Sequence, residues 1–202
     1  MTSKQSSLFP DRKRKEDPKE SLTILRDLDR SEVEPLAYKI LSEIEPFCEK
    51  AQIAGSIRRQ KSVINDIDVV VQPKLEPCGK TESWIKIIQV LRHDFDAITG
   101  KQGDKLAMLY VPYVSSKGLG HVQVDLYRAT ERTWGILLLV RTGSAEYNVL
   151  LCNLALSNGL RLQYSQGLVD SRGYVIAGKT EEEVFEALGL PFIIPQDREV
   201  TK

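Results

Sequence analysis

The sequence predicts an α+β protein with two lobes, which three features indicate. Residues 66–71, 106–111 and 121–127 are short apolar runs rich in Val, Leu and Ile, as strands are. Apolar residues at helical spacing lie before, between and after these runs. Short strand-like pieces recur after residue 160. We expect a mixed or antiparallel sheet flanked by helices over residues 21–130, and a small α+β lobe over residues 131–202.

The N-terminal part is expected to contain a tail and one helix. Residues 1–20 are charged and poor in apolar residues, so we expect a disordered tail in which the basic run 12–15 is solvated. Ser31 and Glu34 then form a capping-box pattern. A helix over residues 32–49 should pack behind the sheet through four apolar residues at helical spacing, Leu36, Ile40, Ile44 and Phe47.

The remaining elements follow in order. A helix over residues 82–92 has an apolar stripe that indicates a core position, and residues 112–120 are rich in Ser and Gly, as a hairpin loop is. Helices are expected around 134–138 and 147–154, the second ending at Gly159. Short strands at 160–164 and 174–176 precede a last helix, which Thr180 and Glu183 cap and Gly189 ends.

Composition agrees with an intracellular protein. The 202 residues are 42% hydrophobic, which suffices for one core and a small second lobe. We find neither an apolar run of about 18 residues nor an apolar signal region, so we expect no membrane span and no secretion. The three cysteines match neither a disulfide framework nor a zinc site. The net charge of zero is unusual for a nucleic-acid binder and predicts modest, salt-sensitive affinity.

Two carboxylates one strand period apart carry the first chemical signal. Side chains alternate along a strand, so Asp66 and Asp68 should point to one face while Ile67, Val69 and Val71 point to the other. Carboxylates so close are stable only if they share a proton or a cation, and their oxygens favour Mg2+ or Mn2+. The alternative is a pair of exposed aspartates at the end of a strand.

A candidate phosphate-binding turn precedes these acids by about ten residues. Gly55 lets backbone N–H groups approach a phosphate, Ser56 adds a hydroxyl donor, and the fork of Arg59 matches phosphate oxygens. A third acid, Asp125, lies in an alternating segment opposite to Val124. Asp125 could complete a two-metal site or be an ordinary solvent-facing aspartate. The pattern predicts a site for nucleotidyl transfer.

Four segments in order resemble the family X DNA polymerases, the group of DNA polymerase beta, over roughly residues 31–199. They are Gly55–Val71, Val124–Leu126, Arg141–Asn148 and Leu188–Pro195. The resemblance implies a polymerase beta-like palm followed by a thumb, in a minimal form of the family. It also implies two Mg2+ ions, or Mn2+, held by Asp66, Asp68 and Asp125.

The resemblance also assigns roles to binding residues. The nucleotide-binding set that it implies is Gly55, Ser56, Arg59, Asn65, Gly143, Ser144 and Asn148. The DNA-binding set is Lys61, Gln123 and Arg141, where Arg141 has the alternative of being a solvated helix residue. Val140 and Arg141 replace a Tyr-Phe pair of vertebrate relatives beside the sugar, and Cys152 replaces an arginine that touches the template. By the same resemblance, Gln123 replaces an arginine near the primer terminus. These departures predict altered sugar selection, lower fidelity and a weaker primer grip.

The function that the resemblance implies is template-directed, metal-dependent addition of nucleotides to a primer 3′ end, with short-gap filling in DNA repair. The expected partners are gapped or primer-template DNA, dNTP with rNTP use open, and a DNA ligase, for a monomer without membrane contact. The location would be cytoplasmic and nucleoid-associated, or intracellular and virus-encoded. The alternatives are a template-independent or small-substrate nucleotidyltransferase and a non-catalytic nucleic-acid-binding module.

Overall fold

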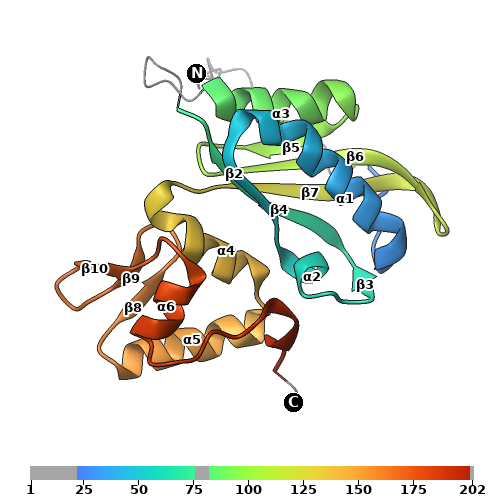
Figure 1. Ribbon diagram of the computed structural model, residues 1–202. Helices are drawn as coiled ribbons and strands as arrows, with labels where there is room; N and C mark the ends of the chain where they lie inside the picture. The colour runs from blue at the N-terminus through green and yellow to red at the C-terminus, as the bar shows by residue number, and fades with distance from the viewer. Residues whose placement is uncertain (1–21, 76–81, 201–202) are drawn as a thin grey trace, which may run out of the picture.

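The computed structural model describes residues 22–75 and 82–200 and has a five-stranded mixed sheet at its centre (Figure 1). The two central strands, β4 and β7, run parallel, and the other neighbouring pairs are antiparallel. The predicted α+β fold with a mixed sheet is therefore confirmed. In spatial order the strands are β2 (Cys48–Ile53), β4 (Asp66–Pro73), β7 (Gly118–Arg128), β6 (Leu106–Ser115) and β5 (Ile98–Gln102).

Two helices, α1 (Arg30–Ile44) and α3 (Glu82–Asp94), cover one face of this sheet (Figure 1). The helices and the apolar face of the strands form the largest hydrophobic cluster. The predicted stripe of α3 belongs to it, because Trp84, Ile87 and Leu91 are all buried. Burying apolar area on this face leaves the opposite face of the central strands for polar chemistry.

The C-terminal lobe lies against that opposite face (Figure 1). Its helix α4 packs on Val70 and Tyr127 of the sheet through Trp134, Leu137 and Leu138. A separate hydrophobic cluster joins α4, α5 and α6 to a three-stranded antiparallel sheet in the order β10-β9-β8. The elements are α4 (Trp134–Thr142), α5 (Ala145–Ser157), β8 (Arg161–Gln163), β9 (Gly167–Val169), β10 (Val175–Ala177) and α6 (Glu181–Ala187).

Short elements complete the fold. Strands β1 and β3 pair with each other, and α2 follows β2 directly. Within residues 22–75 and 82–200, 3-10 turns lie before β2, before α4 and near the C-terminus. The bounds are β1 (Leu28–Asp29), η2 (Glu45–Phe47), α2 (Gly55–Arg58), β3 (Val63–Ile64), η3 (Glu131–Thr133) and η4 (Pro195–Asp197).

The prediction for the first helix was wrong at both ends. Asp29, not Ser31, is the N-cap, and its carboxylate accepts a bond of 2.8 Å from the N–H of Ser31. The α-helix ends at Ile44 rather than near residue 49. Pro46 has no N–H to donate to the carbonyl four residues earlier, so the chain continues as a 3-10 turn and then as β2.

The predicted hairpin is present, but its loop is shorter than residues 112–120. Strand β6 continues to Ser115, and β7 begins at Gly118. Pro112 is tolerated inside β6 because β5 pairs only with the earlier part of that strand, which leaves the outer edge beside Pro112 without a neighbouring strand. Strands β1, β2, β3, β5 and β9 were not predicted.

The predicted cap of the last helix and the predicted end of α5 are confirmed. Thr180 caps α6 by accepting a bond of 3.1 Å from the N–H of Glu183, and Gly159 has a φ of 71° just after α5. Cys48 and Cys152 are free thiols. No helix within the described ranges is both long and apolar enough to span a bilayer. The tail 1–20 and Cys78 lie outside the described residues, so the predictions for them stay predictions.

Candidate active site

Gly55 begins the turn that leads from β2 into α2, directly above the acids. Its φ is 59°, a region that residues with a Cβ rarely adopt. A Cβ built there would lie 2.0 Å from Oδ2 of Asp68. Glycine therefore brings the backbone of this turn against the carboxylate.

The next residue, Ser56, lines a cleft between the two lobes. Its Oγ is buried and has no hydrogen-bond partner among the described residues. A buried hydroxyl without a partner is costly, so it is suited to a ligand oxygen at this position. Asn65 is engaged differently, because its Oδ1 accepts a bond of 2.8 Å from the backbone N–H of Asp27.

The parallel pairing of β4 and β7 brings the predicted acids to one face. Asp66 is in register with Gln123 and Asp68 with Asp125, while Ile67, Val69 and Val71 enter the core as predicted. Val70 follows the acids on the same face and contacts the C-terminal lobe. The acids thus lie where that face meets the second lobe.

The three carboxylates disfavour each other's charge. Burial, then the charges of Asp66 and Asp125, raise the pKa of Asp68 to about 7, against the positive charge of Arg141. Burial also raises the pKa of Asp125 and of Asp66. Each shift means that the ionised form is less stable here than in water, although the positive charges of nearby arginines oppose the shifts.

Asp125 is buried, and neighbouring side chains hydrogen-bond to its carboxylate. Its side chain is 7% exposed, so the solvent-facing alternative was wrong. Nε2 of Gln123 donates to both carboxylate oxygens at 3.2 Å, and the hydroxyl of Tyr127 donates to Oδ2 at 3.2 Å. Gln123 in turn accepts a bond of 3.2 Å from Arg26. These bonds fix the orientation of the third acid.

The donor set suits a hard divalent cation, although the carboxylates do not form a closed cage. Across residues 22–75 and 82–200, no group of three or more His, Cys, Asp and Glu side chains meets at a point that could hold a metal ion. Nevertheless, oxygen donors on adjacent strands with raised pKa values are those that Mg2+ or Mn2+ would stabilise. The assignment of Asp66, Asp68 and Asp125 as metal ligands therefore stays a prediction.

A cleft of about 480 Å3 lies between the two lobes, and Asp66 and Asp68 form part of its wall. Asp125 and Gln123 do not line it. The cleft brings together most of the predicted site residues, namely Gly55, Ser56, Arg59, Lys61, Asn65, Asp66, Asp68, Arg141, Gly143, Ser144 and Asn148. A larger cavity of about 820 Å3 lies in the C-terminal lobe, and none of the three acids lines it.

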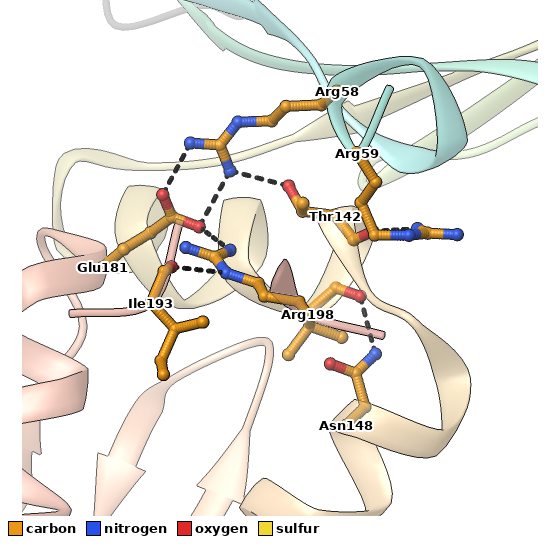
Figure 2. A network of polar contacts seen from close by, with 8 residues as sticks. Arg58, Arg59, Thr142, Asn148, Glu181, Ile193 and Arg198 are labelled. Carbon is orange, nitrogen blue, oxygen red and sulfur yellow. Dashed lines mark hydrogen bonds and ion pairs between the residues drawn. The ribbon is translucent and has the colours of Figure 1, made fainter. Parts of the chain in front are cut away.

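The second lobe contributes the start of α5 to the cleft. Ser144 caps α5 by accepting a bond of 3.2 Å from the N–H of Tyr147. Nδ2 of Asn148 donates to the carbonyl of Val140 at 2.8 Å (Figure 2), while its buried Oδ1 has no partner among the residues described. Asn148 itself lines the cleft between the lobes.

Arg141 is not the solvated helix residue that the sequence left open. Its guanidinium carbon lies 4.0 Å from the ring centroid of Tyr127, a cation–π contact, and its positive charge favours the ionised forms of Asp68 and Asp125. Arg141 thus places positive charge from the second lobe beside the acids.

A buried ionic network joins α2 to the C-terminal lobe (Figure 2). Arg58 of α2 donates to both carboxylate oxygens of Glu181 at 2.8 and 2.6 Å and to the hydroxyl of Thr142 at 2.7 Å. Arg198, which is fully buried, donates to the same Glu181 at 2.6 Å. Burial alone would raise the pKa of Glu181, but the two arginines lower it.

Four residues near the site were missed by sequence reasoning. Tyr127 lies one strand period after Asp125, so alternation could have placed it on the acidic face. Arg26, Glu181 and Glu199 reach the site from distant positions, and no local pattern marks them.

The comparisons with known proteins agree with this geometry. Residues 137–199, which lie within the C-terminal lobe, match the family model described as DNA polymerase beta thumb. Over 162 residues the chain is 28% identical to DNA polymerase lambda of Rattus norvegicus, an alignment that covers 72% of this chain and 28% of the relative. The chain is related to the family X DNA polymerases, as a distant homologue of DNA polymerase lambda. It spans about 28% of the length of that relative.

Proposed function

We propose that the protein is a metal-dependent, template-directed DNA polymerase that adds nucleotides to a primer 3′ end, mainly to fill short gaps. The carrying observation is the inter-lobe cleft, in which the Gly55 turn and the acids of the sheet face the first turn of a polymerase beta-type thumb. A nucleotidyl-transfer site needs a phosphate cradle, acidic metal ligands and a surface for the nucleoside. The cleft and Asp125 beneath it provide candidates for all three.

Within this proposal the chain mainly positions its substrates. The hydroxyl of Ser56 and the guanidinium of Arg59 would bind phosphate oxygens of the incoming nucleotide, since both line the cleft. Asp66, Asp68 and Asp125 would hold two divalent ions, which lower the pKa of the primer hydroxyl and neutralise charge on the phosphates. Gln123 and Tyr127 keep the carboxylate of Asp125 oriented by their hydrogen bonds.

The thumb side would contact the nucleoside. The buried Oδ1 of Asn148 is an acceptor without a partner among the described residues, and Gly143 and Ser144 line the cleft next to it. Arg141 adds a charged side chain where vertebrate relatives have an aromatic one, so both dNTP and rNTP belong in the test. A DNA ligase would seal the product after gap filling.

The test is incorporation on defined DNA. A labelled one-nucleotide-gapped duplex, an open primer-template and a single strand are incubated with individual dNTPs or rNTPs and with Mg2+ or Mn2+. We expect template-matched extension that is strongest on the gap. Asp125→Asn should fold normally, with an unchanged circular dichroism spectrum, and lose extension by about a thousandfold or more. Unchanged extension by this variant would contradict the proposal.

A second candidate, template-independent nucleotidyl transfer, is favoured by the surface of α5. This helix contains neither Lys nor Arg, and it exposes the apolar side chains of Val149 and Leu150. Phosphate contacts to a template need cationic or polar donors, which these side chains lack. Extension of the single strand, independent of template sequence in the same assay, would select this candidate.

A further inference from the structure

Glu199, near the C-terminus, forms ion pairs with two cations of the cleft. Its Oε1 lies 2.6 Å from Nε of Arg59, and its Oε2 lies 3.4 Å from Nζ of Lys61. Both cations line the cleft beside Ser56 and Asp66. One carboxylate therefore bridges two of the cationic side chains that line this cleft and could bind an anionic ligand.

The geometry of Arg59 makes this contact more than an ordinary surface ion pair. The Arg59 side chain is only 14% exposed, and it also donates to the carbonyl of Thr142 at the end of α4 (Figure 2). The bond to that carbonyl orients the guanidinium, so the entropic cost that weakens exposed ion pairs is small. The pKa of Glu199 is lowered by Arg59 and Lys61, although burial opposes the shift.

We propose that Glu199 is an internal competitor for the phosphate site: its carboxylate must leave Arg59 and Lys61 before a polyphosphate contacts both. The inference deepens the proposed function, since it takes the cleft to be the site of a nucleotide triphosphate. A carboxylate and a phosphate oxygen bind the same faces of a guanidinium, so they exclude each other there. Affinity for every polyphosphate that uses both cations is reduced by the same factor, and pyrophosphate leaves faster because Glu199 returns.

The test measures polyphosphate binding without nucleotide, DNA or metal. Inorganic pyrophosphate and tripolyphosphate are titrated into the full chain in the presence of a chelator, by isothermal calorimetry. Glu199→Gln keeps the size of the side chain and removes its charge, so both affinities should rise by about 3- to 10-fold and by a similar factor. Glu131→Gln removes one charge from an exposed residue outside the cleft and should change neither.

The opposite role predicts the opposite sign. If Glu199 holds Arg59 ready for the ligand, Glu199→Gln weakens binding, which overturns the proposal, as does an unchanged affinity or the absence of binding in both proteins. Glu199→Asp keeps the charge with a shorter reach and should give an intermediate affinity. In a Lys61→Gln background the gain from Glu199→Gln should shrink, because one of the two displaced pairs is already absent.

This outcome is independent of catalysis. Tight polyphosphate binding by Glu199→Gln together with inactivity on every DNA substrate would refute the proposed polymerase and leave the competition in place. Activity on gapped DNA with no effect of Glu199 on binding would do the reverse.

Discussion

Two clusters of charged residues flank the turn at Gly55, and they are built in opposite ways. In the joint between the lobes, Glu181 lies between Arg58 and Arg198 at 2.6–2.8 Å, and its pKa is lowered. On the sheet, Asp66, Asp68 and Asp125 lie on one face of the adjacent strands β4 and β7, and all three pKa values are raised. In the joint every charged side chain has an oppositely charged partner, whereas the three acids are surrounded by one another's like charge. We infer that the joint stabilises the fold and that the acids serve chemistry.

The largest expected effect comes from breaking the joint. Glu181→Gln leaves Arg58 and the fully buried Arg198 without a counter-charge, so the free energy of unfolding should fall by about 3–5 kcal/mol. Urea unfolding followed by circular dichroism measures it. Glu182→Gln, an exposed residue in the same turn of α6, is the control and should change stability by less than about 0.5 kcal/mol. Equal stability of the two variants would remove the contrast between the clusters.

The same joint predicts a dependence on acid. The pKa of Glu181 in the folded protein lies below its ordinary value of 4.5, so its stabilising contribution is complete above that value. As the pH falls through the lowered pKa, the carboxylate takes up a proton and the contribution is lost. The wild-type protein should therefore lose more stability than Glu181→Gln below about pH 4.5, as measured by unfolding at a series of pH values. Parallel losses in both proteins would contradict the ionic account of the joint.

An intermediate effect is expected between the clusters, at Gly55. In Gly55→Ala the new methyl group would collide with Oδ2 of Asp68 on a backbone with a φ of 59°. We expect a loss of about 2–3 kcal/mol in unfolding free energy, together with loss of nucleotide addition. Gly159→Ala has a similar φ of 71° but nothing within 4 Å of the new carbon, so only about 1 kcal/mol should be lost. Equal costs at both positions would mean that the approach to Asp68 is unimportant.

The smallest effect has the opposite sign. The pKa of Asp68 is about 7 in the folded protein, against an ordinary value of 3.8. The folded state therefore loses stability as the pH rises from about 4 to about 7, because Asp68 ionises less readily there than in the unfolded chain. With a chelator at about pH 8, Asp68→Asn should therefore raise the free energy of unfolding by about 1–2 kcal/mol and still abolish nucleotide addition. A destabilised variant would show that the acids, like the joint, contribute to the fold.

In the five-stranded sheet the central strands were predictable and the edge strands were not, for a physical reason. The run from Asp66 to Val71 is buried on one side and acidic on the other, so its period of two is visible in the sequence. Strands β2 and β5 form the two edges of the sheet and carry exposed polar residues such as Glu49 and Lys101. An edge strand takes its structure from a neighbour rather than from its own apolar pattern.

The residues of the candidate site also divide into those that the sequence predicted and those that it did not. Gly55, Asp66 and Asp68 were found because they lie within one short segment, and Asp125 because it alternates with apolar residues. The partners that complete the surroundings lie far along the chain: Glu181 is 123 positions from Arg58, and Glu199 is 140 positions from Arg59. Such pairs arise only when the C-terminal lobe docks on the sheet, which no local pattern encodes.

The parallel pairing of β4 with β7 has a consequence for how the site can vary. Asp68 and Asp125 are register partners on adjacent strands, so main-chain hydrogen bonds set the interval between their Cα atoms. Neighbouring side chains can be exchanged without altering this interval. A slip of one residue between the strands would instead turn a carboxylate into the apolar core, and burying an unpaired carboxylate there would strongly destabilise the fold. The backbone of the sheet thus fixes the spacing of the two acids independently of the side chains around them.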